Sequence, residues 1–266
     1  MKGMKYLAGA TLGLAGLTML AGVAAAEESK PTADLTVSAL SQYVWRGFAT
    51  TKDSVVLQPS MTVGYKDFAF NLWGNLDTDR WGGADAGTNS WTETDLTLSY
   101  NWNIGPVAMS GGYIYYGLDS VPDTQEVFLS ATLDTLLKPT LKVYRDIDHS
   151  AGWYATLGVS HSVPVTKELS LDLGAQVGYL AADNASSYAD PHDTTKAYRN
   201  FHDGLLSAAM KIPVTQYLAV TPQLYYSFPL SSDARDLLKD ANGSDSGIGR
   251  RDASFVYGGV AVSLTF

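Results

Sequence analysis

The 266-residue sequence contains no cysteine. That absence excludes disulfides, thiolate metal ligands, a cysteine nucleophile and a lipid-modified N-terminal cysteine. Positive charge is also scarce, because 18 Lys and Arg stand against 27 Asp and Glu, for a formal net charge of −9. A chain with this charge is a poor partner for nucleic acid and attracts cations instead.

Long apolar runs are almost absent, and the single clear one lies at the N-terminus. Lys2 and Lys5 precede an uncharged segment over 6–23, and Ala24-Ala25-Ala26 then matches the small-residue cleavage pattern of a signal peptide. We therefore expect residues 1–26 to be removed on export, rather than kept as an anchor helix, and residues 27–266 to form one domain. No later stretch approaches the roughly 18 apolar residues that a spanning helix needs, so a mature chain that crosses a membrane must do so as a closed barrel.

The dominant pattern after residue 26 has period two, which is typical of β-strands. Leu96, Leu98 and Tyr100, for example, share one face of a segment, and Asp95 and Thr97 share the other. Such segments are about ten residues long, the length of a tilted membrane strand. About twelve of them are present by this pattern, near 33–46, 55–65, 68–77, 93–102, 106–117, 125–134, 139–148, 152–163, 168–181, 203–213, 217–229 and 253–266.

The connections between these segments alternate between short turns and long loops, with both chain ends on the short side. A soluble sandwich has no reason to segregate loop lengths in this way, whereas outer-membrane barrels do so. The sequence therefore predicts an all-β fold: a transmembrane antiparallel β-barrel of about 12 strands with short periplasmic turns and long extracellular loops. Pro59 and Pro222 predict local bulges, and residues 232–239 predict a short helix capped by Ser232.

The last strand ends on an aromatic residue. Phe266, Leu264 and Val262 share its apolar face. A terminal aromatic residue on such a strand resembles the signal by which outer-membrane proteins are recognised by the barrel assembly machinery. We therefore expect that machinery to be a transient partner.

The two faces of the strands imply different surroundings. The apolar face would contact lipid, and ten aromatic residues fit two interfacial girdles: Tyr43, Trp45, Tyr65, Tyr100, Trp102, Tyr113, Tyr115, Trp153, Tyr179 and Tyr226. The polar face would line the interior. Its candidate pore-lining residues are Gln42, Arg46, Gln58, Asn71, Asn75, Asp77, Asp95, Glu126, Lys142, Asp146, Asp172, Gln176, Lys211 and Gln223.

Interior charges such as Arg46, Lys142 and Lys211 allow two interpretations. They either line a wet pore and set its selectivity, or they neutralise the carboxylates and seal the barrel. Eight strands leave an interior filled by side chains and 16–18 leave an open channel, so twelve strands favour a narrow pore without requiring one.

The segment Ser41-Gln-Tyr-Val-Trp-Arg-Gly47, followed by the strand Phe70-Asn-Leu-Trp-Gly-Asn-Leu-Asp77, resembles the TorF family of proteobacterial porin-like proteins. The resemblance covers the first hairpins and, beyond them, only the strand layout. It implies an outer-membrane barrel, with Arg46 as a lumen or rim residue, and it does not specify a solute.

Enzyme chemistry has weaker support. His149 and Ser150 lie in a predicted outer loop with Asp146 and Asp148 nearby, the minimum for nucleophilic catalysis, whereas His161-Ser162 lie at the opposite rim. Possible metal ligands between 190 and 203 match no defined spacing. We predict no catalytic residues, no metal and no cofactor.

Three hypotheses follow: a porin-like channel for small hydrophilic solutes or ions, an outer-membrane enzyme of the lipase or hydrolase type, and a non-conducting structural or surface-recognition barrel. The first is the prediction. It places the mature chain in the outer membrane of a Gram-negative bacterium after export through the periplasm. The expected partners are membrane lipid, the assembly machinery and the transported solutes. An apolar outer face also accommodates a second copy of the chain, so a homo-oligomer is compatible with the sequence.

Overall fold

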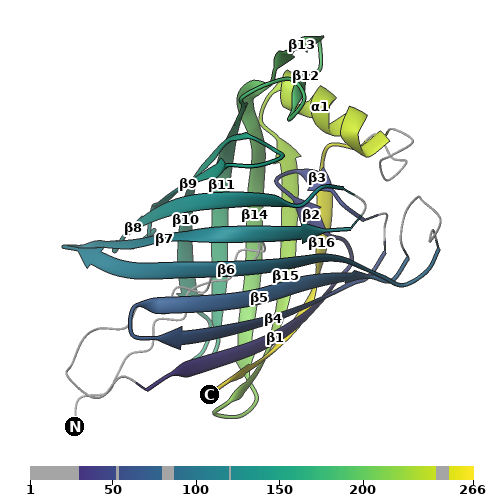
Figure 1. Ribbon diagram of the computed structural model, residues 1–266. Helices are drawn as coiled ribbons and strands as arrows, with labels where there is room; N and C mark the ends of the chain where they lie inside the picture. The colour runs from purple at the N-terminus through teal and green to yellow at the C-terminus, as the bar shows by residue number, and fades with distance from the viewer. Residues whose placement is uncertain (1–29, 52–53, 80–86, 120, 244–251) are drawn as a thin grey trace.

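A computed structural model describes residues 30–51, 54–79, 87–119, 121–243 and 252–266, so the predicted signal peptide lies outside the described residues. Twelve antiparallel strands close into a barrel in the order β1-β16-β15-β14-β11-β10-β9-β8-β7-β6-β5-β4 (Figure 1). This architecture confirms the predicted fold class. The wall strands are β1 (Thr32–Leu40), β4 (Val56–Tyr65), β5 (Phe68–Asp77), β6 (Ser90–Ile104), β7 (Val107–Leu118), β8 (Thr124–Leu133), β9 (Thr140–Asp146), β10 (Gly152–Pro164), β11 (Ser170–Ala182), β14 (Arg199–Pro213), β15 (Leu218–Pro229) and β16 (Phe255–Thr265).

The barrel closes by pairing the first wall strand with the last. The register between β1 and β16 runs without a shift from Asp34 opposite Thr265 to Leu40 opposite Gly259. At the end of this seam the backbone N–H of Phe266 donates to the carbonyl of Ala33 over 2.8 Å. Because every wall strand has two neighbours, the ring leaves no sheet edge unpaired.

Connection length divides the barrel into two ends. Five short turns, together with the start of β1 and the end of β16, form what we call the turn end (Figure 1). The long connections meet at the opposite end, the loop end, and contain all the remaining elements. These are β2 (Val44–Trp45), β3 (Phe48–Ala49), β12 (Ala189–Asp190), β13 (Asp193–Ala197) and α1 (Ser232–Gly243).

The outside of the wall is apolar, as the alternation predicts. Leu98 is 54% exposed, and the aromatic side chains of Tyr65 and Trp153 are also exposed. Two of the ten predicted girdle residues are placed differently, because Tyr43 and Trp45 lie in the connection between β1 and β4 and not on a wall strand. Both lie in a segment that leaves the wall, described below.

The predicted bulges at the two prolines are wrong. The register between β4 and β5 continues across Pro59, and the register between β14 and β15 continues across Pro222, although some ladder pairs beside each proline are missing. A missing amide donor is therefore accommodated without a shift of the chain. The register shifts instead next to Asn75 in β5 and next to Val177 in β11.

Helix α1 lies across the loop end and packs against the barrel interior. Ser231, not the predicted Ser232, caps it, because the Ser231 hydroxyl accepts a hydrogen bond from the Ala234 amide over 3.0 Å. Ala234 and Leu238 of this helix are fully buried on the face that it turns toward the barrel. Within the described part of the chain, no helix is long and apolar enough to cross a bilayer.

A candidate constriction inside the barrel

The connection between β1 and β4 folds back into the barrel instead of extending away from it. The predicted first strand, 33–46, is wrong in its second half, since β1 ends at Leu40 and the chain then forms the small β2–β3 hairpin. Arg46 and Gly47 make its two-residue turn with φ values of 50° and 82°, which fit a turn with two left-handed residues. We call residues 43–50 the lumenal hairpin; the Thr50 amide closes it by donating to the Tyr43 carbonyl over 3.0 Å.

One side of the lumenal hairpin is apolar and packs against the nearby wall. Tyr43 and Val44 belong to a buried cluster with Trp73 of β5, Tyr225 of β15 and Tyr257 of β16. The Tyr43 and Trp73 ring centroids are 5.5 Å apart. This packing fixes the base of the hairpin against the β1 side of the barrel.

Helix α1 holds the hairpin from above. The Ala49 amide donates to Oδ1 of Asn242 over 3.2 Å. A Cβ atom added at Gly47 would lie 3.0 Å from Leu238 and 3.3 Å from Asp203. The turn therefore lies between α1 and β14, in a space that accommodates glycine but leaves no room for a side chain.

The tip of the hairpin reaches the far wall. The Arg46 guanidinium donates to both carboxylate oxygens of Glu126 on β8, over 2.8 Å and 2.7 Å. In the strand order, β8 is five strands from β1 in one direction and seven in the other. The ion pair therefore bridges almost the full width of the lumen. Its side chains are 7% and 2% exposed, so water does not screen it.

Aromatic rings surround the same guanidinium. Its central carbon lies 4.3 Å from the Trp45 ring, 4.2 Å from the Tyr154 ring and 5.0 Å from the Tyr144 ring, all within the range of cation–π attraction. The Tyr116 hydroxyl donates to Oε2 of Glu126 over 2.8 Å. We call the four wall residues Tyr116, Glu126, Tyr144 and Tyr154 the wall cage.

The surroundings of Arg46 favour the protonated, charged form of its guanidinium. Burial alone lowers the pKa of an arginine, because the charged form loses its hydration. Here the Glu126 carboxylate, together with the hydroxyls of Tyr116 and Tyr154, outweighs that effect, and the pKa of Arg46 is raised. The guanidinium is therefore protonated at neutral pH.

Further carboxylates line the loop-end half of the lumen. Besides Glu126, the buried inward-facing acids there are Asp77, Glu93, Asp95, Asp146 and Asp203. Some are partnered by hydroxyl groups: Ser54 donates to Asp77 over 2.6 Å, and Tyr154 donates to Asp203 over 2.8 Å. Oδ1 of Asp95 is buried and accepts no hydrogen bond from the described residues. Six buried acids and one buried guanidinium thus lie in this part of the described chain.

Most of the predicted pore-lining residues lie on inward-facing positions, but they do not form one site. Arg46 and Glu126 meet, and Gln58 donates to Asn75 over 3.0 Å. The remaining residues pair with other groups or lie apart. Buried are Gln42, Arg46, Gln58, Asn71, Asn75, Asp77, Asp95, Glu126, Asp146, Asp172 and Gln176; Lys142 and Gln223 are half-buried, and Lys211 is exposed near the turn end.

Sequence reasoning missed five residues of the constriction: Glu93, Tyr116, Tyr144, Tyr154 and Asp203. Strand parity could have found Tyr116 and Tyr154, because successive side chains of a strand point to opposite faces. Their neighbours Tyr115 and Trp153 are predicted to face outward, so Tyr116 and Tyr154 must face inward. Asp203 is the first residue of the predicted strand 203–213, whereas β14 already begins at Arg199 and places Asp203 within the wall.

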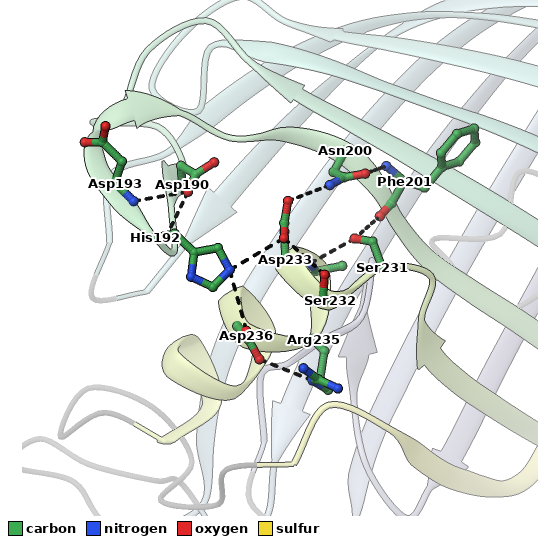
Figure 2. Close-up of polar contacts among 11 residues, drawn as sticks. Asp190, His192, Asp193, Asn200, Phe201, Ser231, Ser232, Asp233, Arg235 and Asp236 are labelled. Carbon is green, nitrogen blue, oxygen red and sulfur yellow. Dashed lines mark hydrogen bonds and ion pairs between the residues drawn. The ribbon is translucent and has the colours of Figure 1, made fainter.

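The loop end carries a second polar cluster, between α1 and the β12–β13 connection (Figure 2). Nε2 of His192 lies 3.5 Å from Oδ1 of Asp233 and 3.7 Å from Oδ2 of Asp236. Asn200 of β14 donates to Asp233 over 2.8 Å. His202, grouped with His192 in the sequence, is instead buried inside the barrel, so the two histidines do not share a site.

The residues considered for catalysis are not arranged as a triad. His149 is 59% exposed, and its Nδ1 lies 3.5 Å from Oδ1 of Asp148. The Asp146 carboxylate accepts instead from Thr124, over 2.7 Å. Among the described contacts, no hydrogen bond joins His149 to the hydroxyl of Ser150.

Solved structures share this fold. A NanC porin aligns with a TM-score of 0.54 at 11% identity, covering 86% of this chain and 98% of that one. A KdgM porin aligns with a TM-score of 0.52 at 10% identity, covering 88% and 99%. A KdgM porin in complex with disordered oligogalacturonate gives 0.50 at 10% identity, with the same coverage. No protein-family model and no curated protein matches the sequence, so the resemblance to the TorF family stays a prediction. At these identities the likeness establishes the fold alone: a closed 12-stranded antiparallel barrel.

Proposed function

We propose that this protein is an outer-membrane channel through which small hydrophilic solutes or ions diffuse passively. Residues 1–26 would direct export and be removed, and residues 27–266 would form the barrel in the outer membrane of a Gram-negative bacterium. The turn end would face the periplasm. Phe266, Leu264 and Val262 would be read by the assembly machinery; Phe266 is 68% exposed and Val262 44% exposed on the outer face.

The observation that carries this proposal is the contrast between the two faces of one closed wall. The outside presents apolar side chains such as Leu98 and Val260 to the surroundings, as lipid requires. The inside carries ionised and amide side chains that would be costly to bury around a dry core. A polar lumen in an apolar shell suits a water-filled path.

The lumenal hairpin would set the narrowest point of that path. It crosses the loop-end half from the β1 side to Glu126 on β8, while inward positions of the turn-end half carry small residues such as Ser160 and Thr132. The six acids around one guanidinium would favour cations over anions at this point.

Planar-bilayer recording tests the proposal. We expect conductance steps from the wild-type protein, a reversal potential in a KCl gradient that reports preference for K⁺, and larger steps from Arg46→Ala. The matched control is Arg145→Ala, which removes an arginine from a partly exposed pair with Asp183 on the outside of the barrel and should leave conductance unchanged. Folded protein that gives no steps in either the wild type or Arg46→Ala would refute the channel.

The second candidate is a non-conducting barrel, and the packing of the loop end favours it in one respect. A second buried cluster contains Tyr154, Leu180, Tyr198 and Ala234. Together with the hairpin cluster, it fills much of the loop-end lumen with apolar side chains. Absence of conductance with normal folding would support this candidate.

A further inference from the structure

The contacts of Arg46 have the chemistry of a ligand-binding site occupied by the protein's own side chain. The Glu126 carboxylate accepts two parallel hydrogen bonds, over 2.8 Å and 2.7 Å, which is the geometry that a guanidinium group fits best. The Tyr154 and Tyr144 rings lie 4.2 Å and 5.0 Å from its central carbon. All three side chains belong to the wall and none to the hairpin.

The carboxylate is also held in place without Arg46. The Tyr116 hydroxyl donates to Oε2 of Glu126 over 2.8 Å. Tyr154 is held independently, because its hydroxyl donates to Asp203 over 2.8 Å. These contacts come from β7, β10 and β14, so the wall cage is preorganised by rigid strands rather than by the hairpin that fills it.

The occupant, by contrast, is carried by a short segment. The hairpin pairs only Val44 with Ala49 and Trp45 with Phe48, and its turn residue Arg46 has a positive φ of 50°, which is unfavourable for a residue with a side chain. A free ligand with the same head group does not carry that backbone cost. It would therefore compete for the cage without that cost, against the high effective concentration that the tether gives Arg46.

We propose that the wall cage is a binding site for guanidinium-bearing cations, and that Arg46 acts as a tethered competitor that closes the lumen while the site is free of ligand. The proposal rests on the proposed function only for the route by which a ligand arrives; binding itself does not require conduction. A quaternary ammonium ion would share the aromatic contacts but has no N–H to donate to Glu126, so guanidinium is the preferred class.

Calorimetric titration of the purified barrel in detergent micelles tests the site, with methylguanidinium as the probe. We expect binding to Arg46→Ala and Arg46→Gln, and at least tenfold weaker binding to the wild type, where Arg46 competes. The double variant Arg46→Ala/Glu126→Gln should also bind at least tenfold more weakly than Arg46→Ala. Methylurea, which is neutral and has the same shape, should not bind.

Three results would overturn the proposal: equal binding to Arg46→Ala and the double variant, binding of methylurea, or tetramethylammonium binding as tightly as methylguanidinium. Heat-dependent gel mobility shows whether each variant is folded. If neither Arg46→Ala nor Arg46→Gln folds, Arg46→Lys provides the test, because it keeps the charge but loses the two parallel hydrogen bonds to Glu126. If Arg46→Lys then binds methylguanidinium no more tightly than the wild type does, the proposal is refuted. A barrel that binds the probe but gives no conductance steps would refute only the channel, and one that conducts without binding would refute only the cage.

Discussion

Removing one member of the Arg46–Glu126 pair should destabilise the barrel strongly. Both side chains are at least nine-tenths buried, and leaving one buried charge without its partner typically costs about 3–5 kcal/mol. Replacing both by apolar residues of similar size, Arg46→Met and Glu126→Leu, removes the unpaired charge as well. The double variant should therefore be less destabilised than the sum of the single variants, with a coupling energy of up to about 3 kcal/mol for a desolvated, bidentate pair.

Equilibrium unfolding in urea, followed by tryptophan fluorescence in micelles, measures how much each single variant and the double variant lower the free energy of unfolding. Urea is the appropriate denaturant because guanidinium would occupy the wall cage. The control is the Arg145–Asp183 pair, which has nearly the same geometry at 2.8 Å and 2.6 Å but is partly exposed. Its coupling should be much smaller because solvent screens it. A coupling between Arg46 and Glu126 below about 0.5 kcal/mol would show that the cross-lumen pair behaves as a surface pair, and the reasoning would fail.

Three further predictions concern backbone conformation and pH. Gly47→Ala should lower the free energy of unfolding by more than Gly105→Ala. Both glycines have positive φ, but only at Gly47 would the added Cβ have other atoms within 4 Å. Urea midpoints compare the two variants, and equal effects would contradict the steric argument. Gly259→Ala should abolish barrel closure, seen as loss of heat-dependent gel mobility, because its Cβ would lie 1.8 Å from a carbonyl oxygen of the neighbouring strand. The hydrogen bond from Lys196 lowers the pKa of Asp193 to about 2, so the stabilisation of the β12–β13 hairpin should persist above the ordinary pKa of aspartate and be lost as pH falls through about 2. Carboxyl chemical shifts of Asp193 in Lys196→Ala should titrate at a higher pH than in the wild type, although the Thr195 amide and hydroxyl still donate to this carboxylate, and an unchanged pKa would contradict this cause.

The wall could be predicted from the sequence because period two acts locally. Each strand must place apolar side chains outside and polar ones inside, so a segment such as 93–102 shows its orientation residue by residue. Loop lengths then fixed the direction of each hairpin. The closed barrel required no long-range information beyond the even number of strands.

The constriction could not be predicted in the same way, because it depends on contacts between distant segments. Arg46 and Glu126 are 80 residues apart, and nothing in 41–50 departs from strand-like composition enough to show that the chain leaves the wall after Leu40. The partial exceptions are Tyr116 and Tyr154, whose orientation follows from their neighbours. Period two shows that they face inward, but not that they surround a guanidinium.

The pairing of β1 with β16 has a consequence for how the molecule is made. The two partners of this seam are the first and the last wall strands in chain order, so the ring cannot be completed until β16 is available. Until then, one side of β1 and one side of β15 expose backbone amides and carbonyls without a partner strand. Completion is therefore a late event that pairs β1 with β16, and linking the start of β1 to the end of β16 while opening a short turn elsewhere would move that event to a different pair of strands.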